Sequence, residues 1–327
     1  MKKLLMLLFV LGLATFLFAQ DAPELKVRLG GSVQSMVSYA SVDSGDALMG
    51  VGLRRVRLRA YASFGKSLKG FIQYSAKSNK VLDARITYIF SPQFNVRIGR
   101  FIGAGMKAGG LTSHTSIDIV ERPVSAQKWG AMTIGADYRD YGIAFFGKKS
   151  MFKYNLTLQN GNGAKNITSS HKSNNNALSV SGSGMTVSGM ASVTPMKALE
   201  VGGYYGVGNK NYNEYTSYSA YVYYQPEKFR FKAEMVSIEK DPVTSMGYYV
   251  FGAYRATDNI EVLGRYEQWD ANTDIDNNEE TDITIGATYS MFPNKWKASK
   301  ITVAYVLQQE DPSIDNNVLY AMFQLIF

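Results

Sequence analysis

Three arginines alternate along one stretch of the chain, and their side chains could attract or bind anions. In the stretch GLRRVRLRAYASF, from Gly52 to Phe64, they are Arg55, Arg57 and Arg59. Alternate residues of a β-strand point to the same face, so a strand would place the three guanidinium groups in a row, about 7 Å apart. Each guanidinium is a lasting cation whose planar donors fit carboxylate and phosphate oxygens.

The opposite face of this stretch is apolar, and it decides between two environments. A soluble sheet would bury that face, whereas a membrane barrel would turn it to lipid and the arginines to a water-filled bore. Three arginines facing lipid would together cost about 6–12 kcal/mol, so we expect them to face the bore. Arg54 would then lie on the lipid side at the outer end of the strand, where the cost is about 0–1 kcal/mol. The apolar residues are Val56, Leu58, Ala60, Ala62 and Phe64.

Two further arginines, Arg85 and Arg97, alternate with apolar residues in the next strand-like stretches. With the first three they would form one basic wall that concentrates anions and repels cations. Alternatively, these arginines pair with acids such as Asp83 or Glu121 and only shape the bore. Other acids expected inside the barrel would keep the basic region local: Glu234, Glu261 and Glu267.

The sequence offers little for catalysis or metal binding. Its two histidines, His114 and His171, lie in expected loops, and neither forms a recognisable triad with a serine. The acidic stretch 270–282 lacks the glycine of a calcium-binding EF-hand loop, so we expect a solvated outer loop. Weak contact of that loop with divalent ions or lipopolysaccharide is the alternative. We therefore expect no enzyme activity, no cofactor and no metal site.

Composition indicates an exported membrane protein. Residues 1–19 have the basic start, apolar run and small final residue of a secretory signal peptide, leaving residues 20–327 as one domain. Cysteine is absent although 46% of residues are hydrophobic, and these are dispersed at alternate positions rather than in spanning helices. The net charge of +8 falls to about +6 without Lys2 and Lys3, and with export it gives no indication of nucleic-acid binding.

Alternation and turn residues predict an all-β, antiparallel, up-and-down transmembrane barrel of sixteen strands. Short turns on one rim and longer polar loops on the other are typical of outer-membrane barrels, with the short turns in the periplasm. An eighteen-strand barrel remains an alternative if 131–138 and 176–181 add two strands. The sixteen expected strands are 26–41, 52–64, 70–77, 82–90, 95–101, 140–147, 152–159, 178–194, 199–208, 217–225, 229–238, 246–255, 260–269, 282–291, 299–308 and 318–327.

Residues 102–139 follow the fifth expected strand and form a long, glycine-rich and poorly periodic segment. Long loops without secondary structure of their own are often functional. We expect this third outer loop to fold into the bore and constrict it. At the other end of the chain, Phe323, Leu325 and Phe327 alternate up to the terminal phenylalanine, which resembles the signal read by barrel-insertion machinery.

The chain also resembles the phosphate-selective porin O/P family between Gly52 and Gly163. The resemblance rests on ordered motifs: GLRRVRLRAYASFGKSLKGFIQY, ARITYIFSPQFNVRIGRF, DIVERP, and DYGIAFFG followed by YNLTLQNGNG. It implies a sixteen-stranded homotrimeric channel in the outer membrane, in contact with lipid and lipopolysaccharide, with an arginine-lined bore that prefers anions. By the same resemblance, Lys107, Glu121 and Arg122 belong to the constricting loop. The proline that members carry after the Gly99-Arg100-Phe101 motif is missing here.

Two functions compete at this point. The first is a porin that lets small hydrophilic solutes diffuse passively, with a preference for phosphate or other small anions. The second is a barrel whose outer loops bind a surface or a partner and which conducts little. The inward arginines and the long third loop favour the first.

Overall fold

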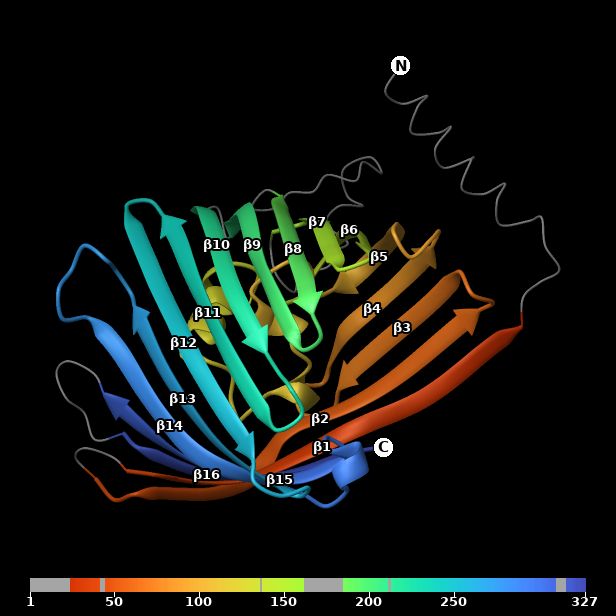
Figure 1. The fold of residues 1–327 in the computed structure, drawn as a ribbon. Helices are drawn as coiled ribbons and strands as arrows, with labels where there is room; N and C mark the ends of the chain where they lie inside the picture. The colour runs from red at the N-terminus through yellow and green to blue at the C-terminus, as the bar shows by residue number, and fades with distance from the viewer. Residues whose placement is uncertain (1–23, 42–44, 136, 162–184, 211–212, 310–315) are drawn as a thin grey trace.

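The computed structural model describes residues 24–41, 45–135, 137–161, 185–210, 213–309 and 316–327. The expected signal peptide, His171 and the stretch 176–181 lie outside these residues. The described strands close into one antiparallel barrel in which each strand pairs with its sequence neighbours and β1 pairs with β16 (Figure 1). The sixteen-strand prediction is confirmed.

The three shortest strands, β3, β5 and β7, lie on one side of the barrel, and all sixteen strands alternate in direction. Their bounds are β1 Leu25–Ala40, β2 Leu48–Phe64, β3 Leu68–Ser75, β4 Lys80–Ile89, β5 Asn95–Phe101, β6 Asp140–Lys149, β7 Phe152–Gln159, β8 Thr186–Met196, β9 Leu199–Lys210, β10 Asn213–Tyr224, β11 Phe229–Lys240, β12 Val243–Arg255, β13 Ile260–Asp270, β14 Glu279–Ser290, β15 Ser299–Gln309 and β16 Val318–Ile326.

One alternative and two predictions about connections were wrong. The stretch 131–138 is not a strand: it begins inside helix α2, Val124–Met132, so the eighteen-strand alternative falls. The described residues of the expected outer loops 209–216 and 239–245 mostly extend the neighbouring strands of two hairpins: β9 continues to Lys210, β10 begins at Asn213, β11 continues to Lys240 and β12 begins at Val243. β2 also begins at Leu48, inside the expected first loop. In each hairpin the additional residues gain ladder hydrogen bonds, which outweighs their polar composition.

The outer face of the barrel is the apolar one. Alternate strand residues present large hydrophobic side chains outward: Leu29 is 77% exposed and Val51 is 79% exposed. Exposing so many large apolar side chains to water would be unfavourable, whereas contact with the hydrocarbon of a membrane is favourable. None of the helices in the described residues is long and apolar enough to cross a membrane.

The barrel closes at the chain's last residues. The backbone amides and carbonyls of Gly31 and Phe327 exchange hydrogen bonds of 2.8 and 3.1 Å, although Phe327 lies just past β16. The Phe327 ring covers Gly31 so closely that a Cβ on that glycine would lie 2.6 Å from it. Phe323, Leu325 and Phe327 are all exposed on the outer face. A glycine at position 31 therefore leaves room for the terminal ring against β1.

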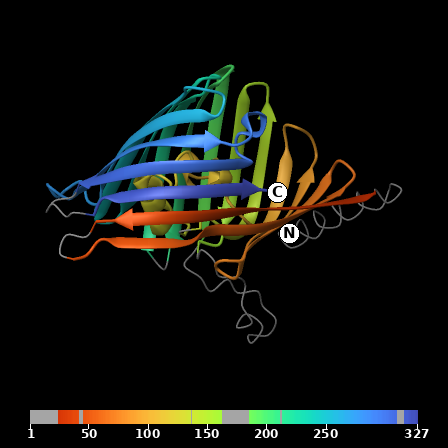
Figure 2. The same ribbon diagram turned by 90° about the horizontal axis from the view of Figure 1, so that it is seen from below.

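The described residues of the segment 102–139 lie inside the barrel (Figures 1 and 2). The sequence suggested that this segment has no secondary structure, but it contains three short helices. They are the π-helical turn η1, Lys107–Leu111, the 3-10 helix η2, His114–Ser116, and α2. Trp129 of α2 stacks on Tyr138 and meets the edge of the Tyr204 ring on β9. This cluster is the buried apolar core that fixes the segment to the wall.

Candidate functional site: the cavity beside the infolded loop

The row of arginines on β2 faces the interior. On β1, the inward-facing positions 34, 32 and 30 pair in register with Arg55, Arg57 and Arg59. The neighbouring residues Val56 and Leu58 face lipid. Arg55 donates to the side-chain oxygen of Gln34 at 3.1 Å. Arg59 donates to the side-chain oxygen of Gln73 on β3 at 2.8 Å.

Arg54 also faces the interior, so its predicted place on the lipid side was wrong. The pairing of β1 with β2 shifts between Gln34 and Ser35, which stand opposite Arg55 and Leu53. The bulge leaves Arg54 without a partner on β1 and turns it inward, where it forms an ion pair with Glu121 of the loop. A bulge of this kind adds one residue to a strand and reverses the faces beyond it.

Arg85 and Arg97 extend the basic wall onto β4 and β5. The Arg85 guanidinium lies over the Phe71 ring, 4.7 Å from its centroid, and 4.0 Å from a carboxylate oxygen of Asp83. Arg97 lies over the Phe146 ring at 4.5 Å. These rings hold the planar guanidinium groups without neutralising their charge.

The infolded segment is held on the opposite half of the barrel by carboxylates that accept its backbone amides. Glu234 of β11 accepts hydrogen bonds from the amides of Lys107 and Ala108, at 2.5 and 2.7 Å. Glu267 of β13 accepts one from the amide of Val124, at the start of α2, at 2.5 Å. Two of the acids expected in the bore thus fasten the loop.

Side chains of the loop add further anchors on that half. Asp118 pairs with Lys232 at 2.7 Å and with Arg230 of β11, and these cations lower the pKa of Asp118 even though burial acts to raise it. Lys107 pairs with Glu200 of β9 at 2.7 Å. Lys107 therefore points away from the arginines and serves the loop's attachment.

Between the loop and the wall formed by β2–β5 lies a cavity of ≈ 780 Å³. All five arginines of the predicted basic wall line it, as do Glu121 and Arg122 of the loop, whereas Lys107 does not. Nine cationic side chains line the cavity against three acidic ones. The cations are Arg54, Arg55, Arg57, Arg59, Arg85, Arg97, Arg122, Lys128 and Arg139, and the acids are Asp83, Glu121 and Asp137.

Each acid in the cavity already has a cationic partner. Glu121 is shared by Arg54 and Arg55, with an oxygen 3.2 Å from Arg55. Asp83 pairs with Arg139 at 2.8 Å, and Asp137 pairs with the buried Arg100 at 2.7 Å. The pairing alternative considered from the sequence is therefore correct for part of the wall.

Arg57 lies at the centre of the row and is not paired. Its Nε and Nη1 are buried and have no hydrogen-bond partner among the described residues. Arg122, in contrast, donates to the carbonyl oxygens of Ala108 and Thr112 in its own loop. The uncompensated cationic charge of the cavity is thus centred on Arg57, with Arg59 beside it bound only to neutral groups.

His114 completes this part of the cavity. Its Nε2 lies 2.8 Å from the Ser32 hydroxyl, and Arg59 Nη2 lies 3.3 Å from both ring nitrogens. Burial, and then the charges of Arg59, Arg57, Arg55 and Arg139, lower the pKa of His114 far below its ordinary value. The imidazole is therefore neutral and adds no charge of its own.

A second cavity, of ≈ 650 Å³, continues toward the rim of the short turns. It shares Tyr61, Phe71, Arg85 and Arg97 with the first and adds Lys26, Arg28 and Lys69 among its lining residues. The Arg28 guanidinium lies over the Tyr61 ring at 4.4 Å. Basic side chains thus follow the β1–β5 wall from the loop to the rim.

Among the arginine, lysine and histidine side chains of the site, sequence reasoning missed four: Arg54, His114, Lys128 and Arg139. For Arg54 a signal existed. Met49, Val51 and Leu53 are apolar at odd positions, whereas Val56 and Leu58 are apolar at even ones, and that change of phase marks the bulge. The other three belong to the infolded segment, whose contacts depend on its tertiary path. Within the described part of the chain, no group of three or more acidic or histidine side chains could hold a metal ion.

The sequence model of one family, described as Gram-negative porin, matches residues 5–308 of the chain. No curated protein is significantly similar in sequence. Among solved structures, the anion-selective porin of Comamonas acidovorans is similar at 15% identity and a TM-score of 0.68, covering 93% of this chain and 100% of its own.

Two further solved structures are similar in fold. The OmpF complex with daunomycin from Salmonella typhi is 15% identical, with a TM-score of 0.69 and coverage of 92% of this chain and 98% of its own. The trimer form of OmpT, an outer membrane protein of Vibrio cholerae, is 12% identical, with a TM-score of 0.61 and coverage of 94% and 100%. At these identities the likeness concerns the fold.

Proposed function

Since the chain belongs to the Gram-negative porin family, we propose that it is an outer-membrane channel through which small hydrophilic solutes diffuse passively, with a preference for anions. The observation that carries the preference is the lining of the larger cavity, where nine cations face three acids that are already paired. In a narrow aqueous passage such an excess concentrates anions and repels cations.

The residues of the wall have different roles in this proposal. Arg57 and Arg59 supply the main attraction for a passing anion, because neither is neutralised by an acid. Arg85 and Arg97 receive the anion on the side of the short turns. Arg55 contributes less, since it shares Glu121 with Arg54. The anion class is that of small carboxylates and phosphates, whose oxygens fit the guanidinium fork.

The loop supplies the constriction. Glu121 sets the local charge, Arg122 holds the loop's own backbone, and Lys107 attaches it to β9. Two likenesses support the anion preference: the resemblance of this chain's motifs to those of the phosphate-selective O/P family, and the fold likeness to the Comamonas acidovorans porin, described as anion-selective.

A flux assay on reconstituted vesicles tests the proposal. Small carboxylates, neutral sugars and amines of matched size are offered to vesicles that contain the channel, and entry is followed by swelling. We expect the carboxylates to enter fastest. Equal entry of acids and amines would contradict the preference, and no entry of any solute would favour a surface-binding barrel with little channel activity.

We also propose that three copies assemble into a homotrimer after export, with residues 1–19 removed and with Phe323, Leu325 and Phe327 read during barrel insertion. The trimer form of the Vibrio cholerae protein OmpT, a fold neighbour, supports the assembly. Native mass spectrometry of the detergent-solubilised protein tests both points, because it gives the number of copies and the mass of the processed chain. A monomer, or a chain retaining its first residues, would contradict them.

A further inference from the structure

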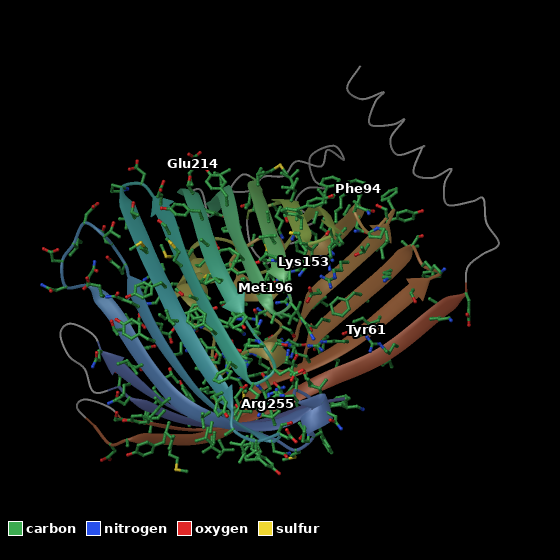
Figure 3. The ribbon with its side chains drawn as sticks, viewed as in Figure 1. Tyr61, Phe94, Lys153, Met196, Glu214 and Arg255 are labelled. Carbon is green, nitrogen blue, oxygen red and sulfur yellow. The ribbon has the colours of Figure 1, made fainter. Side chains whose placement is uncertain are left out.

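Among the described residues, the two rims of the barrel carry opposite charge. On the rim of the outer loops, exposed acids predominate over the exposed lysines Lys77 and Lys80. These acids are Asp46, Glu214, Glu239, Asp241, Asp274 and Asp276. On the rim of the short turns, lysine predominates, and the described turns carry only Glu227 and Asp258 as acids. Figure 3 marks Glu214 at the first rim and Phe94 and Met196 at the second.

Five of the seven short turns carry an exposed lysine at the turn or at the strand end beside it. We call this set the lysine collar: Lys66, Lys149, Lys197, Lys228 and Lys295. The turn after β4 has no charged residue, and the turn after β12 has Asp258. The lysines are thus distributed around the circumference of the barrel and not gathered at one point.

Each lysine of the collar lies within three positions in the sequence of a large exposed hydrophobic residue. Lys149 pairs in register with Phe152, which is 61% exposed, and Lys228 directly precedes Phe229, which is 57% exposed. The other three neighbours are Phe64 for Lys66, Met196 for Lys197 and Phe292 for Lys295, and all three are exposed.

These pairs fix the depth of the ammonium groups. Aromatic side chains on the outer face of a barrel collect at the boundary between hydrocarbon and headgroups. A lysine next to such a ring can extend its flexible stem along the apolar surface and place its charge among the headgroups. The lysine collar therefore lies at the level of lipid phosphates on the short-turn side.

We propose that the lysine collar binds anionic phospholipid headgroups, such as phosphatidylglycerol, in the leaflet that faces the short turns. A zwitterionic headgroup offers no net charge, so the collar gathers an annulus of anionic lipid. A basic residue near an anionic surface gives roughly a fivefold preference, from about 1 kcal/mol per lysine. The neighbouring lipid-facing rings favour this partner over a soluble anionic polymer, which would not reach the outer face of the barrel.

Spin-labelled lipids measure the annulus directly. The full-length protein is reconstituted in phosphatidylethanolamine with labelled phosphatidylglycerol or labelled phosphatidylethanolamine, and the immobilised fraction of each label is compared by electron paramagnetic resonance. We expect the phosphatidylglycerol label to be enriched several-fold at low salt, and less so at high salt because salt screens exposed charges.

Two pairs of substitutions make the test specific. Lys66→Gln with Lys228→Gln removes two collar charges, and Lys77→Gln with Lys80→Gln removes two from the opposite rim. We expect the first pair to reduce the enrichment and the second to leave it intact. Substituting all five collar lysines by glutamine should abolish it, with single-channel conductance retained as proof of folding.

The proposal would be overturned if the two pairs of substitutions gave the same enrichment of the phosphatidylglycerol label. It would also be overturned if replacing all five lysines left that enrichment unchanged. A different result would be retention of the detergent-solubilised protein on isolated peptidoglycan, abolished by the first pair of substitutions, together with no preference for either lipid label. That result would identify the wall polymer, and not the lipid, as the partner of the collar. Since these variants lie outside the bore, failure of the anion preference in flux assays would not alter this result.

Discussion

Replacing Arg57 by glutamine removes the one arginine of the β2 row whose buried donors have no partner among the described residues. The change leaves no acid behind unpaired, because Glu121 keeps Arg54 and Arg55, and Asp83 keeps Arg139. We therefore expect the barrel to fold normally and the anion preference to fall. The apolar face of β2, which determines the register, is untouched.

The size of the effect follows from Coulomb's law. An anion passing about 7 Å from the charge, the spacing of alternate strand residues, gains about 0.6 kcal/mol at the dielectric constant of water and about 2.4 kcal/mol at an effective value near 20. Losing that attraction should reduce the ratio of anion to cation permeability roughly threefold to fiftyfold. Arg57→Glu reverses the charge and should reduce the ratio further.

The assay is the reversal potential of the variant in a planar bilayer at low salt, where screening is weak. Arg57→Lys is the matched control, because it keeps the charge and should retain most of the preference. If Arg57→Gln and Arg57→Glu both have the permeability ratio of the unaltered channel, the arginine row is structural and the reasoning fails.

Three more predictions follow from the loop. Glu121→Gln removes the acid that Arg54 and Arg55 share, so bilayer reversal potentials should show a stronger anion preference; a weaker one would mean that the loop has moved. Glu234→Ala leaves two loop amides without their acceptor, and each lost hydrogen bond to the carboxylate should destabilise the attachment of the loop by about 1.5–3 kcal/mol. Closures in single-channel traces should then become more frequent. Unchanged traces would show that the other anchors hold the loop in place. The fold lowers the pKa of His114, so as pH falls through about 6.5 the unfolded chain takes up a proton that the folded chain does not, and the stability of the fold should decrease there. The thermal unfolding temperature of His114→Gln should therefore depend less on pH than that of the unaltered protein. If its pH dependence is unaltered, groups other than His114 cause it.

The barrel could be predicted from the sequence because lipid imposes a strict rule on each strand. Alternation in β2 and β16, and turn residues between strands, decide which face is apolar and how many strands there are. The same rule placed Arg55, Arg57 and Arg59 on the inner face. It failed at Arg54, since a bulge shifts the alternation by one residue and only the change of phase before Val56 records it.

The infolded segment could be predicted as a long loop but not as a structure. The residues of α2 pack on the wall on one side and line the cavity with Gln127 and Lys128 on the other, so they show no clear membrane or soluble pattern. The anchoring roles of Glu234 and Glu267 depend on amides more than a hundred positions away in the chain. Pairing at that distance leaves no periodic signal.

The direct test of the central claim is the reversal potential of the unaltered channel across a planar bilayer separating two potassium chloride concentrations. We predict a sign that corresponds to chloride carrying most of the current, with the preference declining as salt is raised at a constant ratio. A potential of the opposite sign, with potassium as the main carrier, would contradict the account.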